Sequence, residues 1–167
     1  MQLDKNHTLA TLKDFSNYVV KQSRTNLTKG GKNSSKKLYD SIGYDLNVSK
    51  NSLSVDFKME DYGKFQDRGV SGKIRKFNTP FSYKDKMPPI RAFDRWIVKK
   101  GIAPRSKGKF LSRESLKFAI ARSVFLNGIK PSKFFTKAVE QGFERLPEDV
   151  VQAYGLDVEY FLKTKFK

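Results

Sequence analysis

Apolar residues near the start of the chain recur at steps of three and four positions, which is the spacing of one helix face. The recurring positions are Leu9, Leu12, Phe15 and Val19. Charged and amide side chains fill many of the positions between them, so residues 8–25 are predicted to form an amphipathic helix. Thr8 precedes the first apolar position and is the expected N-cap.

A loop, a short helix and a β-hairpin are predicted next. Residues 29–37 (KGGKNSSKK) contain no apolar side chain and are expected to be a mobile loop, followed by a helical turn over 37–43. Apolar and polar positions alternate over 44–48 and again over 53–59, which predicts an antiparallel hairpin with one inward apolar face. Residues 60–69 then suit a helical turn that ends at its last glycine.

The middle of the chain is basic and rich in turn-forming residues. Residues 70–89 are predicted to form an extended loop with one short strand around 73–77 (KIRKF). A helix over 90–100 follows, and Ser112 is placed to cap a further helix over 113–127.

Proline marks the start of each of the last two predicted helices. Pro131 opens a helix that runs to about Arg145, and Pro147 opens a final helix that Gly155 is expected to break. The predicted class is therefore α+β, with several helices packed on a small antiparallel sheet. A length of 167 residues favours a single domain over 1–167.

The excess of positive charge is the compositional feature that says most about the partners of the protein. The chain has 34 Lys and Arg against 17 Asp and Glu, a formal charge of +17. A folded domain does not need this imbalance, because self-repulsion opposes compactness, so the charge indicates a polyanion or an acidic protein surface as partner. Aromatic residues make up 13% of the chain, which argues against general disorder.

Composition also limits the cellular compartments in which the protein is expected. There is no cysteine, which excludes disulfides and thiolate metal sites and favours a reducing compartment or a virion. The N-terminus lacks the pattern of a signal peptide, and no stretch is apolar enough to span a membrane. We therefore expect a protein that is made and kept in a cytoplasm-like space and has no membrane partner.

Cations gather in the middle of the chain, where we expect contact with DNA phosphates or with an acidic partner. The candidate contact residues are Lys73, Arg75, Lys76, Arg91, Arg95, Lys99, Lys100, Arg105, Lys107, Lys109 and Arg113. Phe77, Phe81 and Tyr83 interleave with these cations, as in proteins that stack single-stranded bases. Packing of this loop onto the core is the favoured alternative.

Catalytic patterns are weak, so no enzyme activity and no cofactor are expected. His7 is the only histidine, and it lies near the chain end, so nucleophilic catalysis has no credible base. Asp45 and Asp56 on the two hairpin strands, with Lys58, are the nearest approach to a Mg²⁺-dependent nuclease site. Charged residues also belong on the polar face of such a strand, and that interpretation is favoured.

Three segments, in this order, resemble the tail-completion or head–tail connector proteins of tailed bacteriophages, which are also called neck or minor tail proteins. The segments are KLYDSI (37–42), YGKFQDRG (62–69) and IKPSKFFTKA (129–138). Residues 71–127 then resemble a basic, partly helical insertion. With this insertion, the segments FFTKAVE (134–140) and LPEDVVQAYGLDVEYFL (146–162) are similar to proteins of phages that infect Bacteroidetes, such as crAss-like phages.

The resemblance implies a structural virion protein that forms a ring at the portal–tail junction. Its partners would be further copies of the chain, portal, connector or tail proteins, and packaged DNA, with assembly in the host cytoplasm. A ring needs heterologous subunit contacts, for which the candidates are Tyr62, Phe65, Trp96, Phe134 and Phe135. For Phe65, Trp96 and Phe135 a core position is the favoured alternative. The rival functions are a stand-alone nucleic-acid-binding protein and, less favoured, a Mg²⁺-dependent nuclease.

Overall fold

The chain folds as two compact units. The computed structural model describes residues 5–32, 35–49, 52–103, 105–106, 109–110 and 112–165. The first unit combines Met1–Glu60 with Phe134–Lys167, and the second is Asp61–Lys133. A single domain was expected, and the predicted insertion over 71–127 lies inside the second unit. Helices and small antiparallel sheets make this an α+β protein, as predicted.

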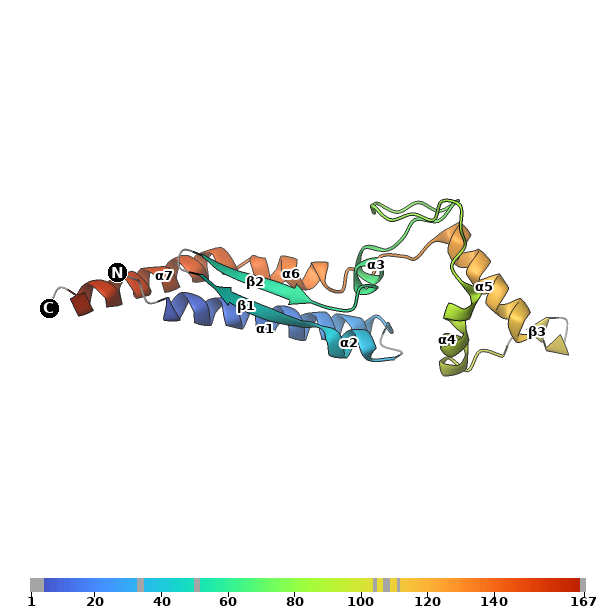
Figure 1. The fold of residues 1–167 in the computed structure, drawn as a ribbon, viewed down its shortest axis with the longest axis horizontal. Coiled ribbons are helices and arrows are strands. Elements are labelled where there is room, and N and C mark those ends of the chain that lie inside the picture. The colour runs from blue at the N-terminus through green and yellow to red at the C-terminus, as the bar shows by residue number, and fades with distance from the viewer. Residues whose placement is uncertain are drawn as a thin grey trace. The chain divides into compact units, whose positions relative to one another are not determined.

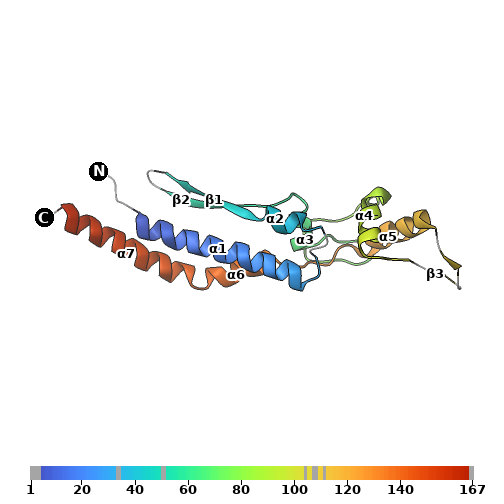
Figure 2. The same ribbon diagram turned by 90° about the horizontal axis from the view of Figure 1, so that it is seen from below.

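In the first unit, a long helix lies between a β-hairpin and a pair of C-terminal helices (Figure 1, Figure 2). The elements are α1 (Asn6–Lys29), α2 (Lys37–Ser41), β1 (Gly43–Val48), β2 (Leu53–Lys58), α6 (Thr136–Phe143) and α7 (Leu146–Lys165). The helix predicted over 8–25 is therefore confirmed and extends further at both ends. Because α1 forms the middle layer, it must bury residues on more than one face.

Small side chains let α1 approach α6 closely. Ser16 and Ser23 on α1 have no exposed surface, and Ala138 on α6 is equally buried. A Cβ built on Gly142 of α6 would lie only 2.7 Å from the ring of Phe15 on α1. At this point the two helices are separated by little more than a glycine, so the packing depends on residue size more than on hydrophobicity.

The N-terminus of α1 is held by a side chain from α7. Asp157 is 2% exposed and accepts hydrogen bonds from the backbone N–H groups of His7 and Thr8, at 2.9 and 3.0 Å. The hydroxyl of Thr8 also donates to it, at 2.7 Å. Thr8 was expected to be the N-cap, and this was wrong. The helix begins at Asn6, and Asp157 accepts from N-terminal amides that have no partner within the helix and that a local cap would otherwise satisfy.

The hairpin is linked to the unit's main apolar cluster through Phe57, whose ring lies 5.4 Å from that of Phe135. β1 and β2 are antiparallel with Tyr44 opposite Phe57, and alternate residues of β2 are half-buried, which confirms the predicted pattern. The cluster consists of Leu27, Leu38, Ile42 and Phe134, with Val20, Tyr39, Met59 and Phe135 packed around it. The C-terminal segment therefore completes a core that the first 60 residues begin.

A predicted helix break and a predicted loop have different outcomes. Gly155 does not break the last helix, because α7 continues through it to Lys165. The loop expected over 29–37 joins α1 to α2, and Asn33 and Ser34 lie outside the described residues. The predicted helical turn over 37–43 begins where α2 begins but ends two residues too late, because α2 ends at Ser41 and Gly43 already belongs to β1. The mobility of this loop stays a prediction.

The second unit is built from short elements and one longer helix. They are α3 (Gly63–Arg68), η1 (Ile90–Phe93), α4 (Asp94–Lys99), β3 (Arg105–Ser106), β4 (Lys109–Phe110) and α5 (Arg113–Asn127). The helix predicted over 90–100 is thus a 3₁₀ turn followed by a short α-helix. Ser112 caps α5 as predicted, since its hydroxyl oxygen accepts from the backbone N–H of Ser115 at 3.1 Å.

Residues 69–83 form a compact structure instead of the expected extended loop. The predicted strand at 73–77 does not form, because the first amides of this segment bond to the end of α5 and not to a neighbouring strand. Val70 and Ile129 exchange backbone hydrogen bonds of 2.9 and 2.7 Å. A Cβ on Gly72 would lie 2.2 Å from the carbonyl oxygen of Leu126, so only glycine permits this close approach.

We predict that Gly142→Ala destabilises the protein by about 1–3 kcal/mol. The added methyl group would meet Phe15, whose ring cannot move aside easily because it packs at 6.2 Å from the Phe57 ring and 5.5 Å from the Phe143 ring. Gly155→Ala is the matched control. It lies inside α7 with no atom within 4 Å of a new Cβ, and should stabilise by up to about 1 kcal/mol. Urea unfolding measures the free energy of unfolding of both variants. Equal changes in the two variants would contradict the packing argument.

We also predict an acid-sensitive contribution from Asp157. Burial acts to raise the pKa of this carboxyl, but the hydrogen bonds from Thr8 and His7 outweigh it and lower the pKa. Because the charged form is favoured in the folded state, its contribution is complete above the unfolded pKa of about 3.9. It is lost as pH falls through the lower folded-state pKa.

Asp157→Asn should therefore lower the free energy of unfolding at neutral pH by about 1–3 kcal/mol. The difference from wild type should shrink as the pH falls below about 4. Asp14→Asn, an exposed change on α1, is the control and should have little effect. Unfolding curves at several pH values provide the measurement, and a constant difference down to the lowest pH would contradict the role of the charge.

Candidate functional site

The positive charge is concentrated in the second unit. Residues 61–133 contain 19 Lys and Arg against 5 Asp and Glu, whereas the rest of the chain contains 15 against 12. The second unit therefore carries 14 of the 17 net charges. Such an imbalance creates a field that attracts anions to one unit and leaves the other nearly neutral.

The first part of the predicted basic surface is a rigid turn, residues 73–76, which we call the basic tip. The backbone N–H of Lys73 donates to the carbonyl of Phe125, and that of Ile74 to Leu126, both at 2.9 Å. The tip thus satisfies the last carbonyls of α5, which places cations at the negative end of the helix dipole. Lys73, Arg75 and Lys76 are exposed, and Ile74 is 73% exposed.

The aromatic residues beside the tip pack within the second unit. The ring of Phe81 lies 4.6 Å from that of Phe65, and Tyr83 lies 6.3 Å from Phe125. Burial raises the pKa of Tyr83. Phe77 lies under the guanidinium of Arg75, at 5.4 Å. The alternative that the loop aromatics pack onto the protein therefore describes them better than base stacking.

A second group of predicted contact residues lies around α4. Arg91, Arg95, Lys99 and Lys100 are exposed. Arg113 is also exposed, and its Nε lies 3.3 Å from Asp94 Oδ1, so part of its charge is neutralised locally. Lys107 lies outside the described residues, as do the side chains of Arg105 and Lys109, whose backbones form β3 and β4.

The charge pattern did not single out Lys117, which is buried on α5. Its ammonium forms an ion pair with Glu114 and lies 3.6 Å from Asp94. The hydrogen bond that Lys117 donates to Glu114 raises the pKa of Lys117, against burial, which lowers it, and Asp94 adds to the increase. Lys117 is 6% exposed and lies one turn before the buried Ala121. The four-residue spacing from Lys117 to Ala121 could have shown that both lie on the buried face of α5, and this burial indicates a structural role for Lys117.

The predicted subunit-contact residues fall into two groups. Tyr62, Phe65 and Trp96 are 42%, 36% and 40% exposed, so each keeps surface for a contact. The core position favoured for Trp96 was wrong, whereas Phe65 is partly exposed and also packs against Phe81. Phe134 is 1% exposed and is a central member of the core cluster, so its assignment as a contact residue was wrong. Phe135 packs against the same cluster and lies 5.4 Å from the ring of Phe57, which agrees with the core alternative.

An exposed apolar surface on α7 was not predicted. The helix buries Ala153 and Asp157, and large apolar side chains on its other sides are about half exposed or more. They are Val151, Tyr154, Leu156, Tyr160 and Leu162. The sequence signal was an apolar run (VVQAYGLDVEYFL) without one clear polar face. Large apolar side chains that stay exposed on one helix indicate a further contact.

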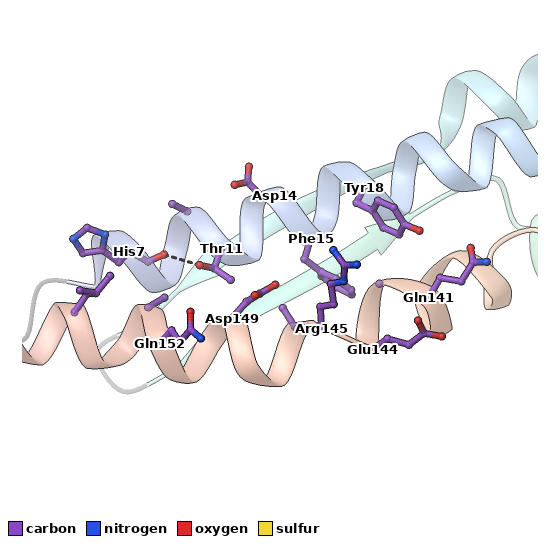
Figure 3. A pocket seen from close by; sticks show the side chains of 15 residues that line it. His7, Thr11, Asp14, Phe15, Tyr18, Gln141, Glu144, Arg145, Asp149 and Gln152 are labelled. Atoms are coloured by element: carbon purple, nitrogen blue, oxygen red, sulfur yellow. Dashed lines mark hydrogen bonds between the residues drawn. The ribbon is translucent and has the colours of Figure 1, made fainter.

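A groove of about 830 Å³ runs between α1 and the α6–α7 segment (Figure 3). Its lining includes the carboxylates of Asp14, Glu144 and Asp149, together with the guanidinium of Arg145. Among the described residues, none of these three carboxylates has a cation paired with it. We call this the acidic groove. It could receive a cationic segment of moderate size.

The structure does bring the two hairpin carboxylates together. Asp45 and Asp56 are directly opposed in the β1–β2 register. However, Lys58 forms an ion pair with Asp45, and the amide of Asn47 donates to Asp56 at 2.5 Å. Within the described ranges, no three His, Cys, Asp or Glu side chains are grouped so that they could hold a metal ion. The hairpin is thus better explained as a polar strand surface.

In the part of the chain that the structure describes, no helix is both long and apolar enough to cross a membrane. Searches against family models, curated proteins and solved structures find no match to this chain. The resemblance to tailed-phage neck proteins therefore stays a prediction.

We predict no DNA cleavage by the hairpin carboxylates. Wild-type protein and Asp56→Ala should leave plasmid DNA equally intact with Mg²⁺ or Mn²⁺, because Lys58 and Asn47 already occupy the two carboxylates. Gel electrophoresis of plasmid DNA is sufficient. Cleavage by wild type that Asp56→Ala abolishes would restore the nuclease interpretation.

Proposed function

We propose that this chain is a structural subunit of a tailed-phage virion, which works in a ring at the portal–tail junction. The observation that carries this proposal is the segregation of charge, with 14 of the 17 net charges on the second unit. The basic unit faces packaged DNA or an acidic neighbouring ring. The first unit provides surfaces that join copies of the chain to one another.

The exposed side of α7 supports the second part of this proposal. A side chain such as Val151, which is 72% exposed, gains hydrophobic stabilisation only when a partner covers it. Several such residues on one helix are typical of an assembly surface. In this proposal the further partners are portal, connector or tail proteins. The protein is located in the host cytoplasm during assembly and afterwards in the neck of the virion. The proposed role needs no cofactor and no catalytic residue.

A stand-alone nucleic-acid-binding protein is the second candidate. The same charge segregation favours it, because 19 cations on 73 residues would also bind phosphates without any ring. The two functions differ in what the isolated monomer does. A stand-alone binder should hold random duplex DNA with micromolar affinity or better, and its affinity should fall steeply with salt.

The deciding experiment combines a gel-shift titration on random duplex DNA with sedimentation velocity on the same sample, at low and moderate salt. We expect weak DNA binding together with oligomers, or with a monomer that associates with portal or tail components. Tight, salt-dependent DNA binding by a monomer would overturn the ring proposal in favour of the second candidate.

Charge-reversal variants show which unit binds the DNA. Arg91→Glu with Arg95→Glu changes the second unit, and Lys13→Glu with Lys21→Glu makes the same charge change on exposed positions of α1. We expect the first pair to weaken residual DNA binding more and to reduce its salt slope, by about 0.9 for each phosphate that the protein no longer neutralises. Equal effects of the two pairs would show that net charge alone, and not the second unit, attracts DNA.

A further inference from the structure

The basic tip presents an unusual combination of side chains. Ile74 is 73% exposed, and Lys73, Arg75 and Lys76 surround it in the sequence. Phosphate binding needs cations but gains little from an exposed aliphatic side chain. The tip is therefore better suited to a partner that offers carboxylates around an apolar surface.

The tip is also held in place before any partner arrives. Gly72 N–H donates to the carbonyl of Arg75 at 2.8 Å, and the ammonium of Lys76 donates to the carbonyl of Gly72 at 2.9 Å. With the bonds to the end of α5, these contacts fix the turn. A preorganised turn loses little conformational entropy on binding. Lys76 keeps two further N–H donors for a partner.

The acidic groove of the first unit has the complementary features. Phe15, Leu146 and Leu156 provide apolar surface, and Leu156 is 50% exposed. The carboxylates around them come from α1 and from the α6–α7 segment (Figure 3). Residues 136–160 contain six Asp and Glu against two Lys and Arg, so this side of the unit is acidic beyond the groove itself.

We propose that the basic tip of one copy seats in the acidic groove of a second copy of this chain. Ile74 contacts the apolar surface, and the cations of the tip pair with Asp14, Glu144 and Asp149. The groove's volume of about 830 Å³ is within the roughly 300–1,000 Å³ range of pockets that enclose a drug-sized ligand, so it has room for a turn of this size.

This inference rests on the proposed function, since it names the contact that would join neighbouring subunits. The tip and the groove are different surfaces, so the contact is heterologous. A heterologous contact can repeat from copy to copy, and it forms a ring when the rotation between copies closes. The pairing is electrostatic at its edge and apolar at its centre, which is the usual arrangement of a specific interface.

Disulfide trapping between two single-cysteine variants tests the contact directly. The chain has no cysteine, so each introduced thiol is the only one present. Ile74→Cys places a thiol on the tip, and Gln152→Cys places one in the groove. The two full-length proteins, one with a mass tag, are mixed at high concentration under mild oxidation. We expect a mixed dimer on a non-reducing gel, formed at least about tenfold faster than in the control pairs, because the contact raises the local thiol concentration.

The controls use exposed residues of the same two units that lie outside the tip and the groove. Glu148→Cys lies about one turn before Gln152 on α7, is exposed and does not line the groove. Val98→Cys replaces Ile74→Cys on the second unit, and Val98 is 60% exposed. If either control pair crosslinks as fast as the test pair, random collision explains the product and the proposed contact is wrong.

A charge swap gives an independent readout. Lys73→Glu with Lys76→Glu, or Glu144→Lys with Asp149→Lys, should each weaken self-association about tenfold, as close charge pairs at interfaces do. Combining all four changes in one chain should restore most of the association, since only a direct pairing is repaired by exchanging the charges. Sedimentation velocity at several concentrations measures the association. Failure of the combined variant to recover would overturn the pairing.

The outcomes separate this inference from the proposed function. If oligomers form but the tip and groove variants neither crosslink nor alter them, the ring remains and this contact is wrong. If no self-association occurs alone or with portal and tail components, both are wrong. If the tip variants leave association intact and instead weaken DNA binding, the tip binds nucleic acid and the inference fails.

Discussion

The close antiparallel packing of α1 against α6 and α7 is the constraint on which the first unit depends. It joins the two ends of the chain, since Asp157 bonds to Thr8 across 149 positions. The packing uses a glycine where the helices meet, Gly142 against Phe15, and a buried carboxylate where α1 begins. The hairpin and the core around Phe134 both assemble on this frame. The middle of the chain can therefore form a unit of its own between two fixed ends.

That division explains how one chain can carry so much charge. The second unit has few apolar residues with little exposure, among them Ile97 and Ala121, and it is stabilised by backbone hydrogen bonds and by the Lys117 ion pairs. The first unit is nearly neutral and contains the larger apolar core. Concentrating cations on one unit limits repulsion within the main core and produces a strongly basic surface on the other. Such an arrangement suits a protein whose partners are acidic surfaces.

Local signals in the sequence were sufficient for many elements. Ser112 was a good predictor of a helix start because an N-cap bonds to amides only two or three residues away. The hairpin followed from its period of two, and the presence of α2 and α3, though not their exact bounds, followed from short motifs with glycine or charge at their ends. Gly155 shows the limit of such signals, because α7 continues through it when neighbouring residues favour the helix and α1 packs alongside.

Charge, element type and the α+β class follow from each residue and its near neighbours, so the order of amino acids is enough to predict them. The burial of Phe134, the cap from Asp157 and the compact fold of residues 69–83 depend on partners from 10 to 149 positions away, which no local pattern contains. The same holds for the acidic groove, whose carboxylates come from both ends of the chain. Tertiary packing brings these groups together because burying the apolar faces of α1, α6 and α7 requires it.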